Sequence, residues 1–111
     1  MASPSRRRLF CVAAALAAMS CLSPTLPLPP PSEPTISGPD ETGTVRLSGR
    51  VRPTAWVFAL DRANQLGVFQ AAEADGSYAL ELQAQVGDEI VMWYEIDGEG
   101  SESLVFTLRA P

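Results

Sequence analysis

Histidine and lysine are absent from this chain of 111 residues, and cysteine occurs only twice. Without histidine, the chain lacks the commonest general base and the commonest transition-metal ligand of proteins. Both cysteines, Cys11 and Cys21, fall within the first 21 residues, so no disulfide can cross-link the remainder. The serines have no base to activate them. The sequence therefore predicts a protein that is not an enzyme and that holds no cofactor and no metal.

Basic residues are scarce beyond the N-terminal segment. From Cys21 onward there are 13 acidic residues and five arginines, a formal charge of −8. The five arginines are Arg46, Arg50, Arg52, Arg62 and Arg109. A surface of this sign repels phosphates, and binding would release no counterions. Nucleic acid is therefore not an expected partner.

No apolar run is long enough to span a bilayer, which needs about 20 residues in a helix. The longest run, Leu9 to Met19, follows Arg6, Arg7 and Arg8 and precedes a small residue, Ser20. A basic segment, a short apolar run and a small residue at a cleavage point are the three parts of a secretory signal. Residues 1–20 are therefore expected to be a signal peptide. The arginines also resemble a twin-arginine export motif, so the general secretory (Sec) route and the twin-arginine route both stay open.

The tetrapeptide Ala18-Met19-Ser20-Cys21 resembles the bacterial lipobox, although leucine is usual at its first position and a small residue at its second. The resemblance implies that Cys21 is acylated and becomes the first residue of a membrane-anchored lipoprotein. Anchoring needs two or more acyl chains, which this modification supplies. Leu22 in place of aspartate implies the outer membrane of a two-membrane cell. The alternative is an ordinary secretory signal, an incidental Cys21, and a secreted or periplasmic protein.

The segment 21–42 is expected to be a tether that begins with the lipidated cysteine. It holds most of the ten prolines of the chain: Pro24, Pro27, Pro29, Pro30, Pro31, Pro34 and Pro39. Proline lacks the backbone donor and fixes its own φ, which predicts an extended chain rather than a helix or sheet. Polyproline geometry advances about 3.1 Å per residue, enough to hold a domain tens of ångströms from a membrane.

From residue 43 to residue 111 the pattern is that of a β domain. Val45, Leu47 and Val51 alternate with polar residues, the period of two of a strand with one buried face. Similar segments are expected at residues 56–60, 66–74, 77–84, 89–97 and 101–109. Asp75-Gly76 predicts a tight hairpin in which both central residues have positive φ. The segment 89–97 is apolar on both faces and is therefore expected at the centre of a sheet.

These segments predict an all-β fold, a small antiparallel β-sandwich of six or seven strands after the signal peptide and the proline-rich linker. The chain also resembles the carboxypeptidase regulatory-like domain, a transthyretin-like β-sandwich. The resemblance is carried by Val45-x-Leu47-x-Gly49-x-Val51, Pro53-x-Ala55-x-Val57, Ala74-Asp75-Gly76-Ser77-Tyr78-x-Leu80 and Gly87-Asp88-x-Ile90. That family is non-catalytic, so the resemblance implies a binding, spacer or accessory role.

Aromatic side chains are the candidate ligand platform, because rings on a sheet can stack on sugars. Alternation places Trp56 with Phe58 and Leu60, so this face is expected to pack in the core. Trp93 and Tyr94 fall on opposite faces of one strand, and one of those faces is expected to be partly exposed. The candidate platform residues are Trp93, Tyr94 and Trp56, and the alternative role for these rings is packing in the core or at a sheet edge.

The sequence thus favours a non-enzymatic, surface-tethered module of the cell envelope with a structural or interaction role. Its expected partners are the membrane, through the lipid, and a protein or glycan. A carbohydrate-binding module is the alternative function. Acidic residues at turns, such as Asp75, Asp88 and Asp97, could supply oxygen ligands to calcium, but aspartate is also favoured in turns for its local hydrogen bonds.

Overall fold

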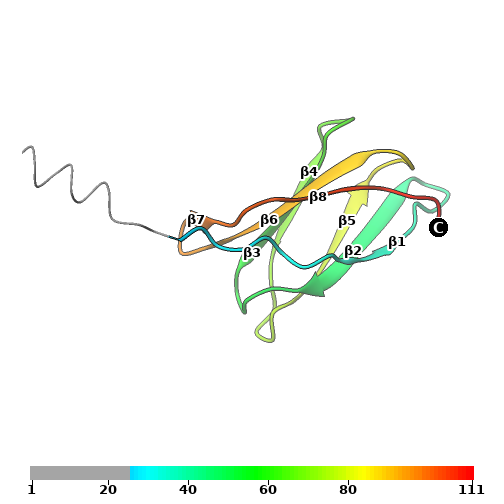
Figure 1. Cartoon of the computed structure of the whole chain (residues 1–111). Coiled ribbons are helices and arrows are strands. Elements are labelled where there is room, and N and C mark those ends of the chain that lie inside the picture. Colours follow the sequence, from blue (N-terminus) through cyan, green and yellow to red (C-terminus); the bar gives the residue numbers. More distant parts are fainter. Residues whose placement is uncertain (1–25) are drawn as a thin grey trace, which may run out of the picture.

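The computed structural model of the chain describes residues 26–111, shown in Figure 1. The expected signal peptide, residues 1–20, and the expected lipidation site, Cys21, lie outside this range. Within residues 26–111, no helix has the length and apolar character needed to cross a membrane.

Two antiparallel sheets make up this part of the chain. Its eight strands are β1 (Thr35–Ser37), β2 (Thr44–Arg50), β3 (Trp56–Asp61), β4 (Gly67–Ala71), β5 (Ser77–Gln83), β6 (Glu89–Ile96), β7 (Glu99–Gly100) and β8 (Leu104–Thr107). The first sheet has the order β1-β2-β5. The second has the order β4-β3-β6, and β7 and β8 both pair with the free side of β6. The predicted all-β sandwich is confirmed, with β6 central as expected; the two short strands β1 and β7 raise the number of strands to eight, above the six or seven predicted.

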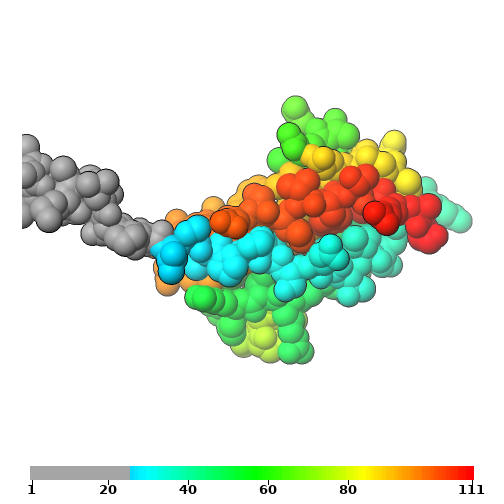
Figure 2. Space-filling view, in the orientation of Figure 1, coloured from blue at the N-terminus to red at the C-terminus, as the bar shows by residue number. Residues whose placement is uncertain are grey.

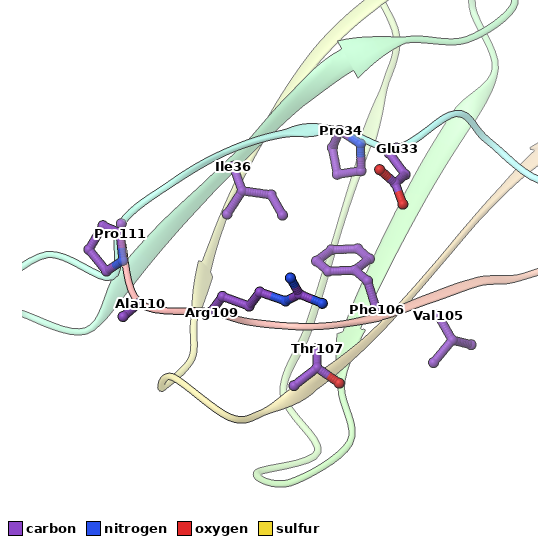
Figure 3. Close-up of a pocket in the computed structure, with 10 residues that line it drawn as sticks. Glu33, Pro34, Ile36, Val105, Phe106, Thr107, Arg109, Ala110 and Pro111 are labelled. Carbon is purple, nitrogen blue, oxygen red and sulfur yellow. The ribbon is translucent and has the colours of Figure 1, made fainter.

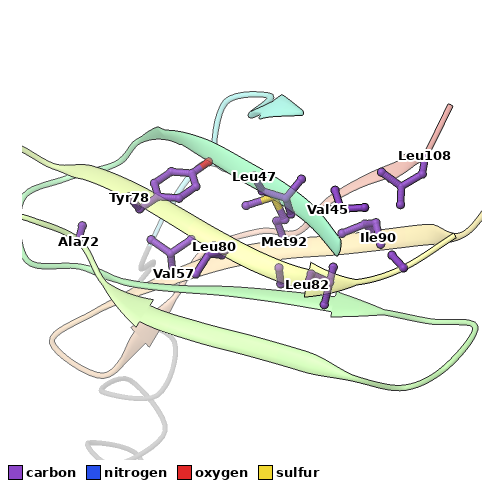
Figure 4. Close-up of a cluster of buried hydrophobic side chains, with 12 residues drawn as sticks. Val45, Leu47, Val57, Ala72, Tyr78, Leu80, Leu82, Ile90, Met92 and Leu108 are labelled. Atoms are coloured by element: carbon purple, nitrogen blue, oxygen red, sulfur yellow. The ribbon is translucent and has the colours of Figure 1, made fainter. Parts of the chain in front are cut away.

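The core lies between the two sheets, and both contribute alternate side chains to it (Figure 4). The first sheet supplies Val45, Leu47, Tyr78, Leu80 and Leu82, and the second supplies Val57, Ala59, Ile90 and Met92, joined by Leu108 after β8. On β2, the alternation predicted from the sequence matches the inward-facing residues, and on β5, β6 and β8 more buried residues alternate with less buried ones in the same way. The period of two therefore positions most of the core.

Strand β3 is turned the other way from the expectation. Val57, Ala59 and Asp61 are buried, whereas Trp56 is exposed and Phe58 and Leu60 are only partly buried. The prediction that Trp56 packs in the core is therefore wrong. Every residue from position 56 to 60 is apolar, so alternation fixed the strand without fixing its phase. The small side chains face inward, and the large ones lie on the outer face of the sheet.

The turn at Asp75-Gly76 does not close the predicted hairpin. It joins β4 in one sheet to β5 in the other, because β4 pairs with β3 and β5 pairs with β2. Gly76 has a φ of 87°, but Asp75 is not among the residues with positive φ. The Gly76 N–H donates to the Glu73 carbonyl at 2.9 Å. A short turn thus carries the chain from one layer of the sandwich to the other.

β-Structure begins before residue 43, within the segment expected to be an extended linker. Strand β1, a proline-free stretch between Pro34 and Pro39, pairs with β2 at the edge of the first sheet. Farther upstream, the Glu102 N–H donates to the Leu28 carbonyl, and Pro31 and Pro34 are buried. Figure 1 and Figure 2 show this segment running beside β8 along the length of the domain. Prolines are compatible with this position because an edge needs few backbone donors.

Candidate functional site

An aromatic strip crosses the outer face of the second sheet. It consists of Trp56 and Phe58 on β3, Phe69 on β4 and Trp93 on β6. Phe58 pairs directly with Phe69 on one side and with Trp93 on the other. Because side chains that are opposite in a sheet share a face, the register of three strands brings these rings together.

The four rings form a chain of contacts. Phe58 and Trp93 are stacked, with ring centroids 5.2 Å apart and planes 3° from parallel. Phe58 also stacks on Phe69 at 5.8 Å and 26°, and Trp56 meets Phe69 at 5.9 Å with a tilt of 53°. Each such pair contributes about 0.5–1.5 kcal/mol beyond the area that it buries. The strip is therefore an ordered surface.

Much of this strip remains in contact with solvent. Phe69 is 66% exposed and Trp56 is 48% exposed, while Phe58 and Trp93 are partly buried. Val105, on the outer face of β8, extends the apolar surface beyond β6. Contiguous exposed apolar surface of this kind marks interaction sites in soluble domains.

The three residues predicted as a platform do not all come together. Trp56 and Trp93 lie on the same outer face. Trp93 is opposite Phe58, and Trp56 is two residues from Phe58 along β3. Tyr94 lies on the opposite face and is buried; it pairs with Val57, and its backbone N–H donates to the Ser101 hydroxyl oxygen at 3.0 Å. Tyr94 is therefore part of the interior.

Sequence reasoning missed two members of the strip, Phe58 and Phe69. Phe58 was placed in the core together with Trp56, and Phe69 lies on a strand whose phase the sequence left open. The available signal was the small residue Ala59 between the larger Phe58 and Leu60: a sandwich interior already filled by large side chains from β2 and β5 has room for alanine there. That signal depends on knowing which strands face β3.

A second surface feature is a groove of about 660 Å³ between β1 and the C-terminal segment (Figure 3). Its walls include Pro34 and Ile36 on one side and Val105 and Phe106 on the other. Glu33 and Arg109 are the charged residues that line it. The groove is therefore lined by apolar side chains together with one acidic and one basic residue.

Asp61 is fully buried and carries the one buried side-chain oxygen without a hydrogen-bond donor among residues 26–111, its Oδ2. Its Oδ1 accepts from the N–H groups of Ala63 at 2.7 Å and Asn64 at 3.2 Å. Burial, followed by the neighbouring Asp88 carboxyl, raises the pKa of Asp61 above its usual value. Hydrogen bonds from Asp61 and from the Gln85 N–H lower the pKa of Asp88. A proton is therefore favoured on Asp61 and disfavoured on Asp88.

The other turn carboxylates are held by local donors. Asp75 Oδ1 accepts from the Ser77 hydroxyl at 2.6 Å and the Ser77 N–H at 2.9 Å, which lowers the pKa of Asp75. Asp40 is held in the same way by Thr42 and Thr44, and its pKa is also lowered. Within residues 26–111, no three acidic, histidine or cysteine side chains are grouped as a metal site would require. These aspartates act as turn-forming residues.

Comparisons of the chain with models of known families, with curated proteins and with solved structures found no match.

Proposed function

We propose that this protein is a non-enzymatic module of the cell envelope that holds a partner on the aromatic strip. The observation that carries the proposal is the exposure of Trp56 and Phe69 within a set of rings that are already packed against one another. A surface that is ordered before binding loses little side-chain entropy when it is covered. Tryptophan and other aromatic residues are also the side chains enriched in the centres of protein interfaces.

The arrangement of the rings favours a protein partner over a glycan. Two rings lying flat and side by side need centroids about 7 Å apart, from the extent of each ring. Phe58 and Trp93 are 5.2 Å apart and nearly parallel, so their faces are turned toward one another. A sugar ring cannot lie flat across both of them. Ring edges and aliphatic surface, such as Val105, suit the side chains of a protein instead.

The tether is the second part of the proposal. An acylated Cys21 would hold the domain at a membrane surface, in the outer membrane of a two-membrane cell. The described chain begins at Leu26, close to that cysteine, and lies against the domain from Leu28 onward. This geometry would keep the domain close to the anchor. Membership of the carboxypeptidase regulatory-like family stays a prediction from the sequence.

The partner is tested by placing a photo-crosslinking amino acid at Trp56 in the full chain, expressed in its own cells. A matched position is Val86, which is similarly exposed but lies between β5 and β6, outside the strip. The proposal expects a defined protein adduct from position 56 and none from position 86. Equal labelling from both positions would contradict it.

The glycan alternative has its own readout. If soluble β-linked oligosaccharides quench the fluorescence of the unsubstituted protein and the effect is lost in Trp56→Ala, a carbohydrate-binding proposal would replace the protein-partner one.

The anchor is tested by the intact mass of the chain from the membrane fraction beside Cys21→Ala. An unacylated N-terminus in the soluble fraction would refute the tether.

A further inference from the structure

Strand β4 is an open edge of the second sheet. Among residues 26–111 it pairs with β3 alone, and four of its five residues are exposed. Its sequence, Gly67-Val68-Phe69-Gln70-Ala71, contains neither a charged residue nor a proline. Charges, prolines and bulges are the usual means by which edge strands avoid pairing with another chain. This edge uses none of them.

The hydrogen bonds to β3 show which backbone groups of β4 are free. The Ala72 N–H donates to the Ala55 carbonyl at 2.8 Å, and the Asp61 N–H donates to the Leu66 carbonyl at 2.9 Å. In an antiparallel pair, the bonded residues alternate along each strand. Val68 and Gln70 therefore point their backbone groups toward β3. Gly67, Phe69 and Ala71 direct theirs to the open edge.

From this pattern we infer that β4 pairs with β4 of a second copy of the chain, antiparallel and centred on Phe69. A twofold axis at Phe69 places Gly67 opposite Ala71 of the other copy. The bonded pairs of this register are formed by Gly67, Phe69 and Ala71, the residues whose N–H and C=O point outward. Val68 and Gln70 of the two copies form the non-bonded pairs between them. Each of the three bonded pairs exchanges two hydrogen bonds, so the strand is self-complementary, as a twofold interface requires.

Charge is compatible with this register. The chain from Cys21 onward carries a formal charge of −8, so two copies repel one another wherever acidic surfaces approach. The strand that is paired here is neutral over its whole length. The nearest carboxylate, that of Glu73, comes opposite Gln65 rather than another acid. The uncharged strand β4 is thus the part of this edge where two acidic molecules can meet.

Side-chain contacts add to the backbone pairing. Phe69 is the most exposed ring of the aromatic strip and stands at the centre of the edge. It stacks on Phe58 on one side only, and the Phe69 of the second copy would lie on its other side. The row of rings would then continue from one molecule into the next. This inference rests on the backbone of β4 and does not depend on the proposed function, whose two tryptophans lie on other strands, Trp56 on β3 and Trp93 on β6.

Cysteine cross-linking tests the register in the full chain. Residues in a bonded antiparallel pair have Cα atoms about 5.5 Å apart, within the range of a disulfide. Phe69→Cys should therefore give a covalent dimer under mild oxidation. Gln70→Cys is the control, because its copies are two residues out of register and about 8 Å apart. The unsubstituted chain reports any dimer formed through Cys11 or Cys21.

Sedimentation tests the edge without a new thiol. Ala71→Pro removes an outward N–H that β3 does not use, so the fold keeps its hydrogen bonds while the edge loses a donor. Ala71→Ser keeps that donor. We expect twice the monomer mass for the unsubstituted chain and for Ala71→Ser, and the monomer mass for Ala71→Pro.

Either of two results would overturn the inference: a monomer mass for the unsubstituted chain at every concentration, or equal disulfide yields from positions 69 and 70. Should Ala71→Pro fail to fold, the cross-linking pair still decides the matter. Failure of the dimer would leave the photo-crosslinking result at Trp56 unaffected.

Discussion

Phe58 and Trp93 lie directly opposite one another on β3 and β6, with parallel rings whose centroids are 5.2 Å apart. Neither ring belongs to the core, which lies on the other side of the sheet. The outer face is thus stabilised by its own contacts. This pair is expected to hold the neighbouring rings, Phe69 above all, in the orientation that a partner would meet.

A double-mutant cycle measures that contact. Phe58→Leu and Trp93→Leu together should destabilise the domain less than the sum of the two single variants, by about 0.5–1.5 kcal/mol. Phe58→Leu with Ile36→Ala, a residue of the other sheet, should show no coupling. Chemical unfolding followed by circular dichroism gives the free energies. Additivity in the first pair would show that the rings merely lie close together.

Asp61 should make stability depend on pH. Its pKa is raised by burial and by Asp88, so the folded state binds a proton more tightly than the unfolded state, whose pKa is about 3.8. The free energy of unfolding should therefore fall as pH rises above 3.8 through the folded pKa. Asp61→Asn keeps an acceptor for Ala63 and cannot ionise. It should stabilise the domain by about 1–3 kcal/mol at pH 7, with no gain at pH 3.

Asp75→Asn is the matched control, since the pKa of Asp75 is shifted in the opposite direction from that of Asp61. Ser77 lowers the pKa of Asp75, so its contribution to stability is present above pH 3.8 and is lost as pH falls through the folded pKa. The variant should be less stable than the unsubstituted chain at pH 7 and equal to it at low pH. Urea unfolding between pH 3 and pH 8 compares the two; parallel curves for all three proteins would refute the assignment of both groups.

Gly76 and Gly98 separate two costs of a side chain at positive φ. Both have φ near +80°, at 87° and 80°. An added Cβ at Gly98 meets nothing, whereas at Gly76 it would lie 2.1 Å from the Val51 carbonyl oxygen. Gly98→Ala should cost about 1–2 kcal/mol, the strain of the left-handed region alone. Gly76→Ala should cost distinctly more in thermal unfolding, and equal losses would mean that the turn relaxes freely.

The N-terminal boundary of the folded unit can be tested by truncation. A chain that begins at Asp40 loses β1 and the buried Pro31 and Pro34. Losing the β1–β2 hydrogen bonds and this apolar contact should lower the free energy of unfolding by about 2–4 kcal/mol relative to a chain that begins at Leu26. Equal stability would show that residues 26–39 only lie on the surface.

Alternation revealed the strands better than it revealed their faces. Where apolar and polar residues alternate, as in β2 and β5, the inward set followed from the sequence. Where all are apolar, as from Trp56 to Leu60, the pattern was equally satisfied by either face. The opposite strands settle the phase, because the space that Leu47 and Leu82 leave decides whether Ala59 or Phe58 fits.

The candidate site was predicted only in part for the same reason. Trp56 and Trp93 come together because β3 pairs with β6, a relationship between strands far apart in the chain. Tyr94 directly follows Trp93 in the chain, and a shift of one residue along a strand reverses the face. The turn at Gly76 was recognised from local chemistry, but the layer to which it leads depends on pairing. Local signals located the elements, and long-range pairing assembled the strip.

The path of residues 26–37 has a mechanical consequence. This segment runs lengthwise beside β8, with Leu28 bridged to Ser101 at one end and β1 paired with β2 farther along, while the C-terminus lies at the opposite end of the domain (Figure 1). A pull on the chain at Leu26, directed away from the domain, therefore acts along these strands rather than across them. The contacts would bear the load together instead of opening one by one, as they would in a peeled hairpin. The segment is thus oriented to resist tension at the point where the chain enters the domain.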